Sequence, residues 1–201
     1  MVLWLVLKIN YMKKNLIIIQ NLEYFQKIFP IERIQVYNSE ITLVISKDLL
    51  KDVLFFLKNN ILCQFKVLTS IAGVDYPLNK FRFQVVYDLL SLKFNSRFRI
   101  KIFSHELMPV FSCVHIFFAA NWFESEIWDM FGVFFVDHPN LKRLLTDYGF
   151  EGHPLRKDFP LSGFIEMRFI ENLKRVSSEQ IEFSQEYRTF NFISPWQVFK
   201  L

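Results

Sequence analysis

The sequence predicts an α+β fold: a mostly antiparallel sheet with helices on one side, followed by a Gly/Pro-rich loop segment and an extended C-terminal arm. Three observations predict it. Helical and strand periodicities alternate in the first part of the chain, four of the five glycines fall between Gly132 and Gly163, and the last part has too few apolar clusters for a core. We therefore expect a globular domain over residues 1–132, a turn-rich segment over 133–163 and an extended arm over 164–201.

The first elements are a helix and a hairpin. Apolar residues recur at helical spacing from Leu16 to Phe29 and stop before Pro30, which cannot continue a helix. Ile31–Tyr37 and Glu40–Ile45 are rich in strand-forming residues and flank the turn pair Asn38-Ser39. The sequence therefore predicts an antiparallel strand pair here.

An amphipathic surface helix follows the hairpin. Ser46 is placed to cap its start, and Asn59-Asn60 marks its end. Its apolar face consists of Leu49, Leu50, Val53, Leu54 and Leu57.

Three further strands are expected over Cys63–Ile71, Phe81–Leu90 and Arg97–Phe103. Turn residues separate these β-branched and aromatic runs, which is typical of neighbouring antiparallel strands. Basic and apolar residues alternate along Arg97–Phe103, so one face of that strand is apolar and the other is solvated. The sheet is therefore covered on one side.

Asn121 to Gly132 has the clearest helix boundaries in the chain. Asn121 is placed as the N-cap, Glu124 as its capping-box partner and Gly132 as the terminating residue. A helical wheel puts the Glu124 carboxylate on the apolar side, so that it faces protein, and puts Trp122, Ser125 and Asp129 on the opposite side.

The charge pattern gives weak support to nucleic-acid binding. The net charge is +4 and the pI is about 9.0, but the basic residues occur as isolated pairs rather than as a patch. Gly149-Phe-Glu-Gly152 matches a GxxG loop, although Glu151 would repel phosphates there. An RNA-binding or ribosomal protein is kept as the alternative function.

Membrane insertion and secretion are not indicated. A spanning helix needs about 20 consecutive apolar residues, and both Met1–Leu7 and Leu16–Ile19 are much shorter. No basic stretch precedes Met1–Leu7 and no clear small-residue cleavage site follows it, so we expect these residues to belong to the mature protein. Cys63 and Cys113, in apolar surroundings, indicate a reducing compartment.

Metal, cluster and nucleotide sites are not expected in this chain. Two cysteines cannot supply the four thiolates of a typical iron–sulfur cluster, and the four histidines form no metal motif. Glycine-rich nucleotide loops are missing from the sequence. A free-standing hydrolase that uses Glu124, Glu126 and His153 is a second alternative function. We favour a structural role for Glu124, in which its carboxylate packs near Arg143 or Arg156.

Two motifs stand out between Asn121 and Gly163: Asn121-Trp-Phe-Glu-Ser-Glu-Ile-Trp-Asp-Met-Phe-Gly132 and Asp147-Tyr-Gly-Phe-Glu-Gly-His-Pro-Leu-Arg-Lys-Asp-Phe-Pro160. This stretch resembles the signature of the 30 kDa subunit of NADH:ubiquinone oxidoreductase, respiratory complex I. The resemblance extends through Val74-Asp-Tyr-Pro77 and Phe81-Arg-Phe to Ser194-Pro-Trp196 and covers roughly residues 60 to 200. Ser125 stands where the family usually has arginine, and Asn140 and Lys142 replace its usual Asp and Arg.

The resemblance implies no catalytic, cofactor-binding or metal-binding residues in this chain. It implies instead a set of interface residues: Glu124, Glu126, Trp128, Asp129, Gly132, His138, Pro139, Arg143, Asp147, Tyr148, Gly149, Phe150, Gly152, Pro154, Arg156, Lys157, Asp158, Phe159, Pro160, Gly163 and Trp196.

The family further implies a structural and assembly role in the hydrophilic arm of the complex. The complex as a whole would use NADH, FMN, iron–sulfur clusters and ubiquinone, none of them held by this chain. Expected partners are the 49 kDa-type quinone-module subunit and neighbouring iron–sulfur subunits, with no nucleic acid and with membrane contact only through the complex. The implied location is the matrix side of the mitochondrial inner membrane, or alternatively the cytoplasmic side of a bacterial plasma membrane.

Overall fold

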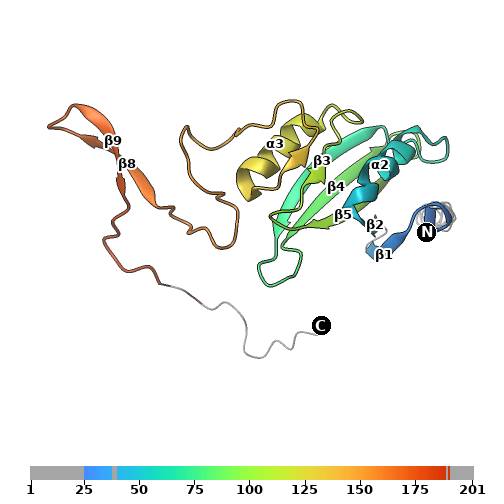
Figure 1. Cartoon of the computed structure of the whole chain (residues 1–201), viewed down its shortest axis with the longest axis horizontal. Helices are drawn as coiled ribbons and strands as arrows, with labels where there is room; N and C mark the ends of the chain where they lie inside the picture. The colour runs from blue at the N-terminus through green and yellow to red at the C-terminus, as the bar shows by residue number, and fades with distance from the viewer. Residues whose placement is uncertain (1–24, 38–39, 189, 191–201) are drawn as a thin grey trace, which may run out of the picture. The chain divides into compact units, whose positions relative to one another are not determined.

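Figure 1 shows a computed structural model of the chain, which describes residues 25–37, 40–188 and 190. The chain divides into two compact units, Met1–Phe159 and Pro160–Leu201, which are described separately below. The division expected from the sequence, at residues 132 and 163, stays a prediction. Most of the expected helix over Leu16–Phe29, the turn at Asn38-Ser39 and the expected interface residue Trp196 lie outside the described residues.

The first unit contains a five-stranded sheet in the order β1-β2-β5-β4-β3. Its strands are β1 (Ile31–Tyr37), β2 (Glu40–Ile45), β3 (Val67–Asp75), β4 (Phe83–Ser91) and β5 (Ser96–Ser104). Every neighbouring pair is antiparallel except β2 and β5, which run parallel. The mostly antiparallel sheet is therefore confirmed.

The parallel pair follows from the path of the chain. After β2 the chain crosses to the far edge of the sheet, forms β3, and returns toward the centre through two antiparallel pairings, so β5 arrives beside β2 in the same direction. The third strand begins at Val67 instead of the expected Cys63, because the residues before it form a turn in which Cys63 N–H bonds to the Asn60 carbonyl (3.1 Å).

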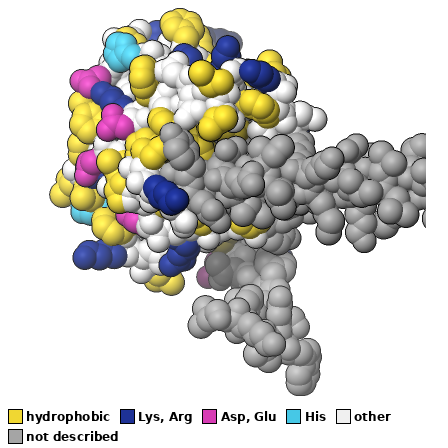
Figure 2. Space-filling model, turned by 90° about the vertical axis from the view of Figure 1, so that its right-hand side faces the viewer, with side chains coloured by type: hydrophobic (Ala, Val, Ile, Leu, Met, Phe, Trp, Pro, Cys, Tyr) yellow, Lys and Arg dark blue, Asp and Glu magenta, His cyan; other side chains and the backbone are white. Residues whose placement is uncertain are grey.

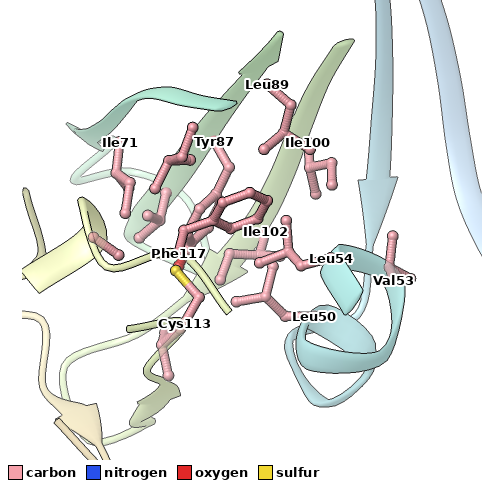
Figure 3. Close-up of a cluster of buried hydrophobic side chains, with 14 of the residues drawn as sticks. Leu50, Val53, Leu54, Ile71, Tyr87, Leu89, Ile100, Ile102, Cys113 and Phe117 are labelled. Atoms are coloured by element: carbon pink, nitrogen blue, oxygen red, sulfur yellow. The ribbon is translucent and has the colours of Figure 1, made fainter. Parts of the chain in front are cut away.

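A short 3-10 helix, η1 (Lys47–Leu49), leads into α2 (Leu50–Asn59). Ser46 precedes η1, but its side chain makes no capping hydrogen bond, so the expected cap is wrong. The apolar face of α2 is confirmed: Leu50, Val53, Leu54 and Leu57 are all buried. Figure 3 shows three of them with sheet residues Tyr87, Leu89, Ile100 and Ile102 in one cluster.

Helix α3 (Ala120–Phe131) covers the same face of the sheet as α2 (Figure 1). A short parallel pair, β6 (Val110–Phe111) and β7 (Phe135–Val136), lies on either side of it in the sequence. Gly132 ends α3 in a left-handed conformation (φ 78°), as predicted. The N-cap is Ala119 and not Asn121, because an earlier turn, in which Ala120 N–H bonds to the Phe117 carbonyl, starts the helix sooner.

The second unit contains a hairpin where the sequence analysis expects only an extended arm. Strands β8 (Ile165–Ile170) and β9 (Arg175–Gln180) pair antiparallel. Residues directly opposite each other share a face, so Met167 and Phe169 lie on the same face as Val176. Arg168 lies on the other face, where it pairs with Glu166 at 2.9 Å and Glu179 at 3.5 Å. The hairpin is therefore amphipathic.

Candidate functional site

The turn-rich segment folds back over the C-terminal end of α3, where helix carbonyls lack partners within the helix. The Phe131 carbonyl accepts from Arg156 Nε at 2.6 Å, and the Met130 carbonyl accepts from the Leu155 N–H at 3.1 Å. The Asp129 carbonyl accepts from His153 Nδ1 at 3.0 Å. Three residues from the segment 143–158 thus satisfy the end of the helix.

The Asp129 side chain anchors the other half of this segment. It is fully buried and accepts hydrogen bonds from the backbone N–H groups of three consecutive residues, Leu144 at 3.1 Å, Leu145 at 2.7 Å and Thr146 at 2.9 Å. Thr146 Oγ1 at 2.6 Å and Arg143 Nη1 at 3.3 Å complete the set. Burial alone would raise the pKa of this carboxyl, but the hydrogen bonds from Thr146, Leu145 and Leu144 outweigh it and lower the pKa.

Asp129 is buried although the helical wheel places it opposite the apolar face of α3. The segment 143–158 covers that side of the helix. Ser125 was assigned to the same side and is also buried, with its Oγ donating to the Asn121 carbonyl at 2.9 Å. Trp122 remains exposed as expected.

A second buried carboxylate, Asp75 at the end of β3, holds the far end of the segment. Arg82 binds it through two bonds, Nε to Oδ1 at 2.7 Å and Nη2 to Oδ2 at 2.9 Å, and the Lys157 N–H adds a third at 2.8 Å. Burial raises the pKa of Asp75, but the Arg82 hydrogen bond and the Lys157 N–H outweigh this and lower it.

The same arginine extends the network to the residues that follow. Arg82 pairs with Asp158 at 2.9 Å and with Glu106 at 2.9 Å, and Arg156 pairs with Glu106 at 3.1 Å. Both guanidinium groups lie over the Phe83 ring, 5.4 and 5.1 Å from its centroid. Asp75 and Arg82 belong to the motifs that resemble the family, but the sequence analysis predicts no role for either. It does not identify Glu106 as a site residue.

Glu124 forms a separate buried cluster. Its Oε1 accepts from the Cys113 N–H at 2.8 Å and from Cys113 Sγ at 3.0 Å, and its Oε2 lies 3.9 Å from His138 Nε2. Burial, followed by the charge of Glu124, raises the pKa of Cys113 well above its ordinary value. The expected capping-box role and the expected contact with Arg143 or Arg156 are both wrong, because Glu124 bonds to the loop before α3.

The position of Glu124 argues against the hydrolase interpretation, in which Glu124 is the general acid. Glu124 is completely buried, so a substrate in solvent has no contact with its carboxyl. His153, its proposed companion, is hydrogen-bonded to the end of α3, and burial, as the main cause, lowers its pKa. Within the described part of the chain, no group of three or more His, Cys, Asp or Glu side chains is placed to hold a metal ion.

The expected interface residues divide by exposure. Three are buried: Glu124, Asp129 and Gly132. Eight are half-buried: Trp128, His138, Arg143, Phe150, Pro154, Arg156, Phe159 and Gly163. Nine are exposed: Glu126, Pro139, Asp147, Tyr148, Gly149, Gly152, Lys157, Asp158 and Pro160. Several of the less exposed residues, such as Asp129 and Arg156, make hydrogen bonds to the backbone of this chain.

The segment 143–158 carries apolar side chains into solvent although its backbone is fixed. Tyr148 is fully exposed, and Leu145 and Leu155 are exposed by 60% and 52%. Exposed apolar side chains also stand among charged ones on the face shown in Figure 2, so exposure alone does not mark an interface. What distinguishes Leu145 and Leu155 is that their own backbone N–H groups bond to α3.

Known proteins similar to this chain form a consistent group. The family model described as respiratory-chain NADH dehydrogenase, 30 Kd subunit, matches residues 43–165. NADH-ubiquinone oxidoreductase subunit 9 of Reclinomonas americana is 50% identical over 177 residues, which is 87% of each chain. An NADH-quinone oxidoreductase subunit of Rhodospirillum rubrum is 50% identical over 82% of this chain and 78% of its own.

A further relative and a solved structure are also similar to this chain. NADH dehydrogenase (ubiquinone) iron-sulfur protein 3 of Patellifolia webbiana is 55% identical over 75% of this chain and 78% of its own. A chain in the structure of the membrane-bound sulfane sulfur reductase, an archaeal respiratory membrane complex, matches 71% of this chain and 85% of its own with a TM-score of 0.62. At 22% identity, that match shows a shared fold.

Two glycines with the same left-handed backbone provide a matched test of the end of α3. A Cβ on Gly132 would meet Arg156 Nη2 at 2.5 Å and His153 Nε2 at 2.6 Å, whereas a Cβ on Gly149 would meet nothing within 4 Å. We expect Gly149→Ala to lower the free energy of unfolding by the backbone cost alone, about 1–2 kcal/mol. Gly132→Ala should lose about 1–3 kcal/mol more through the clash. Urea unfolding of the purified full-length chain measures both changes. Equal losses of unfolding free energy in the two variants would contradict the close approach of Arg156 and His153 to Gly132.

The lowered pKa of Asp129 gives a pH prediction. Its contribution to stability is complete above the ordinary carboxyl pKa of about 3.9 and is lost as the pH falls through the lowered folded-state pKa. Asp129→Asn removes this charge at every pH. The stability difference between wild type and variant should therefore be large near neutral pH and should narrow below about pH 4. Urea midpoints across this range test it, and a constant difference would contradict the assignment.

Proposed function

The chain belongs to the family of the 30 kDa subunit of respiratory-chain NADH dehydrogenase, and on that premise we propose that it is a cofactor-free structural and assembly subunit. It is a subunit of an NADH–quinone oxidoreductase of the respiratory chain. The RNA-binding alternative has no support among its relatives. The role proposed here is to join neighbouring subunits.

An iron–sulfur cluster does not fit the residues of this chain, although one relative carries the name iron-sulfur protein 3. Clusters usually take four cysteine thiolates, and the whole sequence has two cysteines. Cys113 Sγ bonds to Glu124, and burial raises the pKa of Cys63 to about 11, which disfavours the thiolate that a cluster needs. We therefore assign no electron-transfer step to this chain and expect NADH, FMN, the clusters and ubiquinone to be held by other subunits.

The observation that carries the proposal is the exposed apolar surface of the rigid segment 143–158. Ordering a mobile loop on binding costs free energy, and a loop already fixed by backbone hydrogen bonds avoids that cost. Leu145, Tyr148 and Leu155 then present apolar area from a preformed surface, and tyrosine is among the residues that contribute most at protein interfaces. This combination supports docking against another subunit.

The hairpin of the second unit supports a second contact with a partner. Ile165, Met167, Phe169 and Val176 lie on one face and are each about 60% exposed. An isolated two-stranded hairpin is at best marginally stable in water and gains stability from a surface that covers its apolar face. We propose that this face lies against a neighbouring subunit, with the Arg168 ion pairs on the opposite face.

The partners and the location follow from the family resemblance. We propose the 49 kDa-type subunit of the quinone module as the main partner, with iron–sulfur subunits beside it and membrane contact only through the complex. We propose the matrix side of the mitochondrial inner membrane, or the cytoplasmic side of the plasma membrane if the chain is bacterial. Among the described residues, no helix is long and apolar enough to span a bilayer.

Charge substitution of Tyr148 tests the proposal. Because this side chain makes no buried contact, Tyr148→Asp should leave the unfolding free energy of the purified chain within about 0.5 kcal/mol of wild type. It should nevertheless lower the fraction of the chain that migrates with the NADH-oxidising assembly on native gels by about tenfold, because a charge would be buried at the interface. Leu92→Asp is the matched control, since Leu92 is 71% exposed between β4 and β5. Complete assembly of Tyr148→Asp would contradict the proposed surface.

A further inference from the structure

The sheet face opposite α2 and α3 contains a basic hollow that the proposed function leaves unused. Side chains alternate across the strands, so Arg33, Val44, Lys101 and Val86 lie in one row on this outer face. Both α2 and α3 pack on the other face (Figure 1), and within the described ranges no helix covers this one.

The hollow has a volume of about 390 Å³ and a mixed lining. Val44 and Gln84 are 5% and 6% exposed, so they form its floor, and Phe103 adds an aromatic wall. Arg33 and Lys101 bring two positive charges and Glu32 brings one negative charge. A concave surface with net positive charge, a buried valine in its floor and an aromatic wall is complementary to an acidic residue beside an apolar one.

The two basic side chains of the hollow lack acidic partners. Arg99, one row away on the same face, pairs with Asp88 at 2.6 Å. Neither Arg33 nor Lys101 has a carboxylate within 4.0 Å among the residues that the structure describes. The Lys101 side chain is also half-buried in the lining of the hollow. A carboxylate supplied from outside would pair with both.

The chain's own ends are poorly suited to supply that carboxylate. The sequence of residues 1–24 contains Lys8, Lys13 and Lys14 but only one acid, Glu23. The sequence of residues 191–201 contains Lys200 and no acidic side chain. The charge of these two ends therefore disfavours them as occupants, and an acidic segment of another polypeptide has the complementary charge.

We infer that an acidic segment of a neighbouring subunit docks in this hollow, with a carboxylate between Arg33 and Lys101 and an apolar side chain against Val44 and Phe103. This inference rests on the proposed function as an assembly subunit. It adds a contact on a different face from the segment 143–158 and specifies the chemistry of the partner.

Charge reversal in the assembled complex tests the inference. Lys101→Glu should reduce the assembled fraction on native gels by about tenfold or more, because a like charge would face the partner's carboxylate. Lys101→Arg keeps the charge and should assemble like wild type. Lys66→Glu is the matched control, since it reverses an exposed lysine outside the hollow.

Two outcomes would overturn the inference. One is equal assembly of Lys101→Glu and Lys66→Glu while wild type assembles normally. The other is a loss of assembly that a lower melting temperature of the purified Lys101→Glu chain explains completely, which would mean that Lys101 stabilises this chain and not a contact with a partner. If wild type itself is missing from the assembly, the proposed function fails instead.

A photo-crosslinking residue at Gln35, an exposed residue on the rim of the hollow, identifies the occupant directly. In the intact complex, the expected product joins position 35 to an Asp/Glu-rich peptide of another subunit. A crosslink to any segment of this same chain, or to a basic peptide, would overturn the inference.

Discussion

The buried carboxylate of Asp129 is the interaction on which the arrangement of the candidate site depends. A carboxylate out of water is costly unless donors replace the lost solvent, and here three backbone N–H groups, a hydroxyl and a guanidinium do so. Three consecutive N–H groups reach one oxygen only if the backbone curls around it. The side chain therefore determines the shape of the chain at residues 144–146.

A second carboxylate fixes the other end of the same segment. Asp75 receives two bonds from Arg82 and one from the Lys157 N–H, so it joins the edge of the sheet to the residues that follow the α3 contacts. Arg156 lies between the two anchors and bonds to the end of α3. The exposed Tyr148 and Leu155 are thus held by contacts made inside the chain. A surface of this kind binds without first having to be ordered.

Local patterns predicted the elements well because each depends on neighbouring residues. The apolar spacing of Leu50, Val53, Leu54 and Leu57 was sufficient for α2, and Gly132 alone marked the end of α3. The site could not be predicted in the same way. A helical wheel identifies the apolar side of α3, but it cannot show that a segment 15 to 17 residues later covers the polar side and buries Asp129. Glu124 was correctly placed on the side facing protein, yet its partner Cys113 lies in a loop whose path depends on the whole fold.

Hydrogen exchange of the backbone amides of Leu144, Leu145 and Thr146 tests the central claim most directly. Hydrogen bonds to a charged group contribute about 1.5–3 kcal/mol, so Asp129→Asn should speed exchange at these three amides by about tenfold or more. The amides of β4, a strand that pairs on both sides within the sheet, should lose protection only by as much as the variant loses global stability, because core amides exchange through global unfolding. Unchanged protection at residues 144–146 in the variant would contradict the claim that Asp129 holds this segment in place.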